Sequence, residues 1–327
     1  MSVASESTKS IPAKRKLAAK PHLVQDKVFF GIARAAAIGA VAIVALILAY
    51  LLFMSWETIV QQGPGFIFGS QWSAADPENV VFQIGPMLWG SILIAVNGIL
   101  LAVPMAIAAA YFIEFLAGGM VAKIATTVVD LLAAIPSIVI GLWGVGVFSP
   151  VASHWAELLH DNLGFLPFFS NSTDSYVGSP FIAGWIVAVM VVPIITSVTR
   201  EIFSQLDRDV LNAATALGAS RSSSFFRVIL PTSSGGIVGG VLLGLGRALG
   251  ETVAIFFVLN LSFEINWVEV IESRGGSIAS MIVAYFGAAS PVEVKALMAA
   301  GLVLFVITLL INWLAAVIVA KAQPWRK

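Results

Sequence analysis

The sequence predicts an all-α integral membrane protein, and three observations support this. Hydrophobic residues make up 59% of the 327-residue chain and charged residues only 11%, and the mean hydropathy is +0.95. A soluble domain of this composition would expose apolar patches far larger than a monomer tolerates. Six segments are apolar over about 20 residues, the length that crosses the hydrocarbon core of a bilayer as a helix. The bilayer is therefore the expected solvent for most of the chain.

The first predicted span covers 35–54 and follows a basic stretch. Its apolar run exceeds that of a signal peptide, and no small-residue cleavage site comes before Trp56 and Glu57, so we expect an uncleaved helix. The other spans are predicted at 87–113, 131–151, 181–199, 235–261 and 296–320. Residues 277–290 are apolar over only about 14 residues, which predicts a re-entrant or surface-packed helix instead of a span.

The distribution of basic residues predicts the orientation, because Lys and Arg mark the cytoplasmic side of a membrane protein. Loops 56–86 and 150–180 contain neither, and the loop after the fifth span contains only Arg274 and Lys295. The other basic residues outside the spans occur in the amino-terminal tail, in the second-to-third and fourth-to-fifth connections, and in the carboxyl-terminal tail. Six spans with both termini in the cytoplasm satisfy this rule.

The predicted organisation follows from these spans. Residues 1–28 form a disordered basic tail in the cytoplasm, and residues 29–86 hold the first transmembrane helix and an outer loop. Residues 87–320 form the main transmembrane domain, with a cytoplasmic loop at 200–234. Residues 321–327 form a second cytoplasmic tail.

Composition also excludes several functions. Cysteine is absent, which rules out disulfides and thiolate chemistry. Two of the three histidines, His154 and His160, are six residues apart and so lie off-register for one helix face, which leaves no histidine metal cluster. Basic and acidic residues balance at 18 each, which gives nucleic-acid binding no support. No catalytic set is visible, and Asp130 is expected to be an interfacial or capping carboxylate.

The loop 200–234 is predicted to form two short helices joined at a glycine. Residues 207–217 form the first, with Asp207 or Asp209 capping its start and Gly218 ending it. Residues 220–230 form the second, with Arg221 near its start and Pro231 ending it before the next span. Such a pair can simply lie on the membrane surface. Alternatively, its small alanines form a knob that seats in a groove of a partner protein.

Two charged residues interrupt the fifth predicted span. Arg247 and Glu251 are four apart, which places them on one face of a helix. Each costs about 2.5–3.5 kcal/mol at the membrane centre, so they are expected to face protein or a water-filled path. In one interpretation Arg247 contacts a passing anion and Glu251 holds its guanidinium in place, since the planar fork matches an oxyanion. In the other, the two form a buried ion pair that fixes the helix register.

Glycine and proline mark the neighbouring positions. The pairs Gly236–Gly240 and Gly246–Gly250 permit close approach between helices, and a hinge is a second possibility. Pro136 in the third span breaks the helical hydrogen-bond ladder at membrane depth. We expect Ser137 beside it to line the same path as Arg247. The alternative is a proline kink that serves only packing.

Three stretches resemble binding-protein-dependent ABC importer permeases. The first is the cytoplasmic loop signature of that family, Glu-Ala-Ala, three residues, Gly, nine residues, Ile, one residue, Leu-Pro. It is matched here by Ala213, Ala214, Gly218, Leu230 and Pro231, with the conservative Val228 and with Asn212 where the family has glutamate. Residues 246–252 and 134–144 are similar to the permease subunits of phosphate importers. The extra first span and Val253-Ala254 favour the C-type subunit over the A-type.

The resemblance implies a type I ABC importer permease with MetI-like architecture in the bacterial plasma membrane. It implies a substrate path at Arg247, Glu251 and Ser137, with Pro136, Gly246 and Gly250 as packing or hinge residues. The implied ATPase-coupling residues are Asn212, Ala213, Ala214, Gly218, Arg221, Leu230 and Pro231.

The resemblance also implies the partners. These are an ATP-binding subunit, a second, A-type permease and an extracytoplasmic phosphate-binding protein. The chain itself is expected to bind no cofactor and to hydrolyse nothing, because no Gly-rich phosphate loop ending in Gly-Lys-Ser/Thr occurs. Sulfate or molybdate remains an alternative substrate. A secondary anion transporter is a further alternative, although no internal repeat or second charged span is visible.

Overall fold

The computed structural model describes residues 24–74, 79–173 and 175–322. The chain divides into two compact units, Met1–Tyr50 and Leu51–Lys327. The described part of the first unit is the beginning of helix α1 (Val24–Gln62). Most of the predicted tail 1–28, and all but two residues of the predicted tail 321–327, lie outside the described residues.

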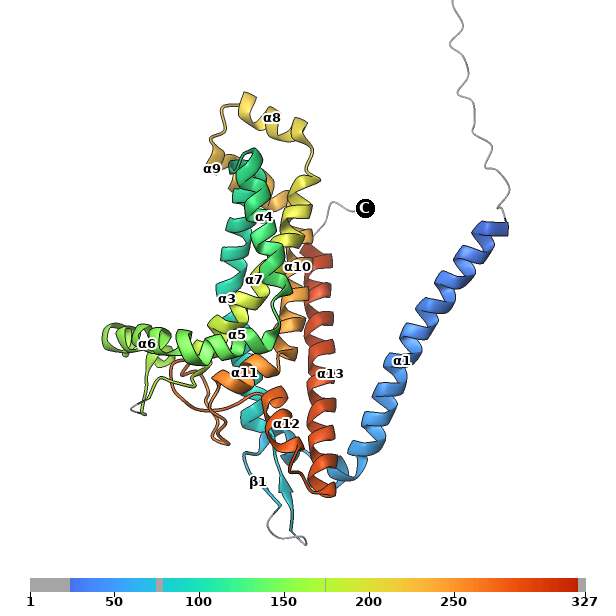
Figure 1. Ribbon diagram of the computed structural model, residues 1–327, viewed down its shortest axis with the longest axis vertical. Helices are drawn as coiled ribbons and strands as arrows, with labels where there is room; N and C mark the ends of the chain where they lie inside the picture. Colours follow the sequence, from blue (N-terminus) through green and yellow to red (C-terminus); the bar gives the residue numbers. More distant parts are fainter. Residues whose placement is uncertain (1–23, 75–78, 174, 323–327) are drawn as a thin grey trace, which may run out of the picture. The chain divides into compact units, whose positions relative to one another are not determined.

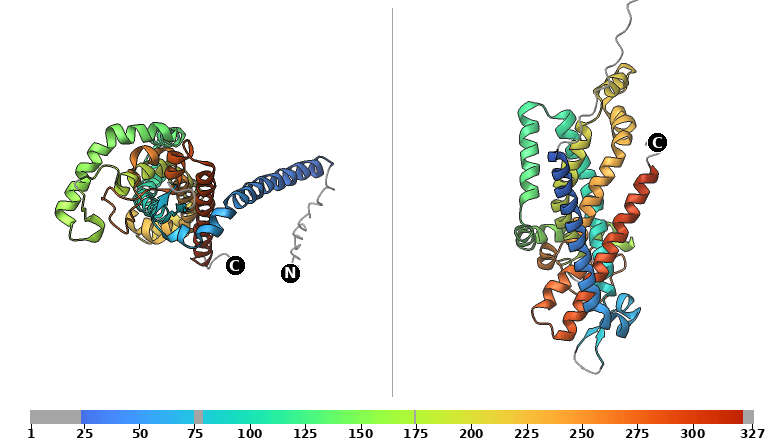
Figure 2. Two further views of the ribbon diagram at one scale, coloured as in Figure 1. Left: turned by 90° about the horizontal axis from the view of Figure 1, so that it is seen from below. Right: turned by 90° about the vertical axis from the view of Figure 1, so that its right-hand side faces the viewer.

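The second unit is a bundle of long helices that run side by side (Figures 1 and 2). They are α3 (Gly85–Tyr111), α7 (Pro180–Ser204), α10 (Leu230–Gly250) and α13 (Pro291–Ala322). Helix α7 lies at the centre and packs against α3 and α10. In the described residues, six helices are long and apolar enough to cross a membrane. The predicted all-α fold with six membrane-length helices is therefore confirmed.

Small residues allow these helices to approach closely. A Cβ atom on Gly244 would lie 2.6 Å from a methyl of Val191 on α7, and one on Gly240 would lie 3.1 Å from a methyl of Val198. Gly236, one turn earlier, faces Ile202 in the same way. The close packing predicted for Gly236 and Gly240 is present, and α7 is the helix they contact.

The third span, predicted at 131–151, is interrupted at Pro136, where the sequence predicts a break in the hydrogen-bond ladder. Helix α4 (Gly119–Ala134) ends before Pro136, and helix α5 (Ser137–Trp143) starts after it. Ile135 and Pro136 are extended, with ψ of 127° and 137°, because proline lacks an N–H and disfavours the α region for the residue before it. A π-helical turn and α6 (Ser149–Leu163) follow, and Figure 1 shows α5 and α6 lying across the direction of α4.

The fifth predicted span is also broken. Helix α10 ends at Gly250, Glu251 is extended with φ −69° and ψ 125°, and the short helix α11 (Val253–Val258) begins two residues later. The start of this segment differs from the prediction as well. Pro231 does not end the preceding helix, and Arg221–Gly250 forms one helical segment. A π-helical turn over Phe225–Ile229 precedes α10, with i→i+5 hydrogen bonds in place of i→i+4 bonds. This wider turn accommodates Pro231, which has no backbone N–H to donate.

The remaining elements cover the end of the bundle opposite α8 (Arg208–Ala216). Helix α2 (Gly65–Phe68) is followed by the antiparallel strands β1 (Trp72–Ser73) and β2 (Val81–Phe82). Helix α12 (Ile278–Phe286) corresponds to the short apolar segment 277–290. It starts with a capping box between Ser277 and Ser280 and packs against α13 and α3. Lys295 and Glu57 form an ion pair that joins the start of α13 to the end of α1.

Candidate functional site

The two helix breaks lie together in space. Helix α5, which begins after the first break, packs against α11, which begins after the second. A Cβ atom on Gly141 would lie only 2.8 Å from the Cα of Ala254, so the two backbones meet where a larger residue does not fit. This contact brings Ser137, the first residue of α5, beside Glu251.

Ser137 forms a bridge between the two charged residues. Nη2 of Arg247 donates to Oγ of Ser137 at 3.4 Å, and the Ser137 hydroxyl donates to Oε2 of Glu251, also at 3.4 Å. Oε1 of Glu251 accepts from the backbone N–H of Ala254 at 3.3 Å, within the first turn of α11. The hydroxyl predicted to lie on the path with Arg247 is thus in contact with it.

Arg247 and Glu251 do not form the direct pair that their spacing suggests. Because α10 ends at Gly250, the helical register between them is lost, and no carboxylate of the described residues lies within ion-pair distance of Arg247. Glu251 is only 7% exposed, whereas Arg247 is exposed. The site therefore presents an open guanidinium with a buried carboxylate behind it. Such a fork binds an oxyanion through two parallel hydrogen bonds.

Asn312 is a polar residue near this site that sequence reasoning missed. It lies in α13, and its Nδ2 is 3.6 Å from the position of a Cβ on Gly246. Its Oδ1 is buried without a hydrogen-bond partner. The sequence signal that could have identified Asn312 was a single amide side chain within the otherwise apolar span predicted at 296–320. A Cβ on Gly250 would meet nothing within 4 Å. Among the described residues, the contact with Asn312 is therefore the one found for the predicted packing or hinge role of Gly246 and Gly250.

The helix–glycine–helix predicted within 200–234 is present, although its second helix continues past Pro231 into α10. Asp207 caps α8 by accepting from the N–H of Asp209 at 2.9 Å. Gly218 ends the helix in the left-handed region with φ +82°, and the N–H of Ala219 bonds to the carbonyl of Ala214 at 3.0 Å. Ser220 then caps the second helix, α9 (Arg221–Ser224), by accepting from the N–H of Ser223.

The residues of the loop signature follow this geometry. Asn212, Ala213 and Ala214 lie in α8, Arg221 begins α9, and Leu230 and Pro231 begin α10. Leu217 and Phe226, outside the signature, leave 90% and 64% of their surface exposed. The loop therefore presents both small and apolar residues outward, which is typical of a surface that another protein covers.

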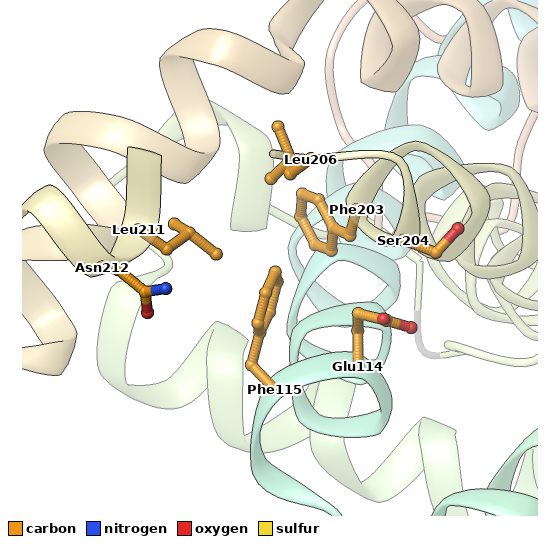
Figure 3. A pocket seen from close by; sticks show the side chains of 7 residues that line it. All are labelled: Glu114, Phe115, Phe203, Ser204, Leu206, Leu211 and Asn212. Atoms are coloured by element: carbon orange, nitrogen blue, oxygen red, sulfur yellow. The ribbon is translucent and has the colours of Figure 1, made fainter. Parts of the chain in front are cut away.

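A cavity of about 250 Å³ lies beneath α8 (Figure 3). Leu211 and Asn212 reach it from α8, and the other lining side chains come from the end of α7 and the turn after α3: Glu114, Phe115, Phe203, Ser204 and Leu206. The rings of Phe115 and Phe203 lie 5.7 Å apart. The contact between α8 and the bundle is therefore partly apolar and leaves unfilled space.

A second polar cluster links two loops at the end of the bundle opposite α8. Arg274 pairs with Glu264 at 3.0 Å and with Glu272 at 3.2 Å, and the hydroxyl of Ser172 donates to Glu272 at 2.5 Å. Nη2 of Arg274 also donates to Ser172 at 3.3 Å. The sequence showed Arg274 only as a loop residue, because its partners come from about 100 residues away as well as from its own loop.

Taken together, a bundle of membrane-length helices, two broken helices that hold an open arginine, and a protruding helix–glycine–helix define a transmembrane permease. The chain belongs to the family of binding-protein-dependent transport system inner membrane components, whose family model matches residues 98–323. It is a multi-pass protein of the plasma membrane. The orientation of its termini stays a prediction.

Curated relatives cover most of the chain. The phosphate transport system permease protein PstC of Haemophilus influenzae is 37% identical over 285 residues, which is 86% of this chain and 89% of that protein. The permease protein PstC 2 of Mycobacterium tuberculosis is 34% identical over 287 residues, 86% and 88% of the two chains. A crystal structure of a bacterial ABC transporter involved in alginate import matches with a TM-score of 0.53 at 17% identity, covering 92% of this chain and 100% of that one. That likeness confirms the type I importer fold.

Proposed function

We propose that this chain is a permease subunit of an ATP-driven importer that carries inorganic phosphate across the plasma membrane. The observation that carries the proposal is the open guanidinium of Arg247, joined through Ser137 to the buried carboxylate of Glu251. The relatives that cover most of the chain are named as phosphate transport permeases, which supports the same substrate.

The electrostatics of the site favour a small oxyanion. An arginine at membrane depth costs about 2.5–3.5 kcal/mol, and no carboxylate of the described residues pairs with Arg247 directly. An anion in the path supplies the missing charge. The single hydroxyl proton of Ser137 points to Glu251, so its oxygen accepts from Arg247 and leaves most of the fork free.

Glu251 favours phosphate over the alternative oxyanions. Inorganic phosphate is a triprotic acid, and each of its ions still carries at least one P–OH proton near neutral pH. That proton can be donated to a carboxylate. Sulfate and molybdate carry only acceptors at this pH, so they have no proton to donate to Glu251.

The partners follow from the surfaces that the chain leaves open. The exposed residues of the α8–α9 loop suit an ATP-binding subunit, where ATP is bound and hydrolysed. The open face around Arg247 and Gly250 suits a second permease of the A type, which completes the walls of the path. An extracytoplasmic phosphate-binding protein delivers substrate at the opposite end. Movement of the loop is then coupled to opening around Arg247.

Reconstitution tests this function directly. The chain, assembled with its ATP-binding subunit, second permease and binding protein in proteoliposomes, is expected to import labelled phosphate only when ATP is present. Arg247→Gln should lower import by at least about tenfold, as expected for loss of a charge-assisted contact, while the complex still assembles. Arg247→Lys keeps the charge but not the fork and should retain part of the activity. Unchanged import by Arg247→Gln would refute the anion contact, and import of sulfate or molybdate in preference to phosphate would refute the substrate.

A further inference from the structure

A second group of basic and hydroxyl side chains lies far from Arg247. It surrounds a cavity of about 510 Å³ between the end of α3, α4 and α7. The lining residues are Ile113, Glu114, Ala122, Lys123, Thr126, Thr127 and Arg200. The α4 residues that line this cavity lie toward the start of that helix, whereas Ser137 begins α5, beyond the other end of α4.

Arg200 is held at this cavity without a counter-charge. It lies near the end of α7, and its Nη1 donates to Oγ1 of Thr126 on α4 at 2.7 Å. In the described part of the chain no carboxylate lies within ion-pair distance of it. The hydrogen bond fixes the orientation of the guanidinium and leaves most of its five donors free for another acceptor.

Lys123 and Thr126 complete a set of donors. They are three residues apart in α4 and so share one face of that helix. Thr126 accepts from Arg200, which leaves its own proton free to donate. Thr127 differs, because its hydroxyl donates to the carbonyl of Lys123 at 3.0 Å and presents only lone pairs. A fork, an ammonium group and a hydroxyl therefore converge on one cavity, which is the donor set that a tetrahedral oxyanion requires.

We propose that Arg200, Lys123 and Thr126 form a second oxyanion-binding site, which takes a phosphoryl group. The ligand is either free phosphate or the headgroup of a phospholipid, since both present the same oxygens. Thr126 lies eight residues, or about 12 Å, before the end of α4 at Ala134, and Ser137 follows only after the extended break at Ile135 and Pro136. A role as a second binding site on the import path rests on the proposed function, whereas binding of the oxyanion at this cavity does not.

Two carboxylates limit how tightly the site binds. Glu114 lines the same cavity, and Asp130 follows Thr127 on the same face of α4. Glu114 also lines the cavity beneath α8 together with Asn212. Glu114 therefore lines both cavities, so its carboxylate lies between the donors of this site and the space beneath α8.

Chemical labelling of Lys123 tests the site without transport. The full chain is purified in a phosphate-free maltoside detergent and acylated with an amine-reactive ester, and labelling of each lysine is measured by peptide mass spectrometry. Saturating inorganic phosphate is expected to slow acylation of Lys123 by about tenfold, because a bound oxyanion holds the ammonium group. Lys295, which pairs with Glu57 outside the cavity, serves as the internal reference and should not change.

Matched variants separate the site from general electrostatics. Arg200→Gln should abolish the protection of Lys123 by phosphate. Arg227→Gln removes a basic residue outside the cavity, at the same end of the bundle, and should leave the protection intact. Protection that survives in Arg200→Gln, or that is lost equally in Arg227→Gln, would overturn the assignment.

A lipid arm distinguishes the two sources of the phosphoryl group. The same labelling is repeated in phosphate-free buffer in nanodiscs of phosphatidylglycerol, with the maltoside sample as the reference. Protection by inorganic phosphate in detergent supports a free anion as ligand. Protection only in the lipid discs supports a headgroup, and the role as a second binding site on the import path is then wrong. Absence of protection in both overturns the site, and it leaves the import assay on Arg247 unaffected.

Discussion

The hydroxyl of Ser137 lies 3.4 Å from Nη2 of Arg247 and 3.4 Å from Oε2 of Glu251, so one small side chain joins the two charges at the helix breaks. Neither charged residue reaches the other directly. The orientation of the guanidinium therefore depends on a residue from a different helix.

Ser137→Ala is expected to reduce phosphate import by about three- to tenfold, which corresponds to the loss of one hydrogen bond to a charged group. Assembly should not change, because the substitution removes one oxygen and fills the same space. Import by proteoliposomes is the measurement. Ser153→Ala is the matched control, since that hydroxyl bonds only to the carbonyl of Ser149 within α6. Equal activity of both variants would mean that the Ser137 bridge has no role.

Gly141→Ala is expected to destabilise the protein by about 1–3 kcal/mol, the usual cost of overpacking. The new methyl would lie 2.8 Å from the backbone Cα of Ala254, which cannot move aside as a side chain can. Because this contact holds α5 against α11, import should fall as well. The melting temperature in detergent is the measurement. Gly146→Ala provides the control, because a Cβ there meets nothing within 4 Å. A melting temperature as low in this control would show that the effect is not steric.

The sequence predicted the elements of this fold whose signals are local. Length and apolar composition identified the membrane helices, and Asp207 and Gly218 identified the ends of α8. The breaks at Pro136 and Glu251 were harder. Pro136 suggested a kink, but the direction of α5 depends on its packing against α11, which no local pattern encodes.

The candidate site was predicted in its members but not in its geometry. Arg247, Glu251 and Ser137 do meet, yet the helical spacing of four residues suggested a direct pair that the break after Gly250 prevents. Asn312 and the Arg200–Thr126 contact were missed because each depends on which helices are neighbours.

Arg274→Gln is expected to lower the melting temperature and to slow import, because it removes the only charge that neutralises Glu272 among the described residues. Glu272 is 5% exposed in its side chain, whereas Glu264 is 66% exposed. Removing the partner of a buried carboxylate lowers the free energy of unfolding by about 1–3 kcal/mol more than removing the partner of an exposed one. Because Arg274 is itself 38% exposed, we expect a loss at the lower end of that range. Glu264→Gln is therefore the matched control and should be nearly neutral. If both variants melt alike, the Arg274–Glu272 contact does not hold the two loops together.

Gly218→Ala is expected to weaken the association with the proposed ATP-binding subunit, because it strains the turn between α8 and α9. Gly218 has φ +82°, where a residue with a Cβ costs about 1 kcal/mol or more. No neighbour lies within 4 Å of the added methyl, so the strain acts only on the backbone. The loop can relieve it by turning α8 away from the apolar contact that Leu211 makes over Phe203 and Phe115. Co-purification with the ATP-binding subunit is the measurement. Gly287→Ala, which has equally open surroundings but φ −69°, should bind normally. Equal binding by the two variants would show that the left-handed turn is not what positions the coupling helix.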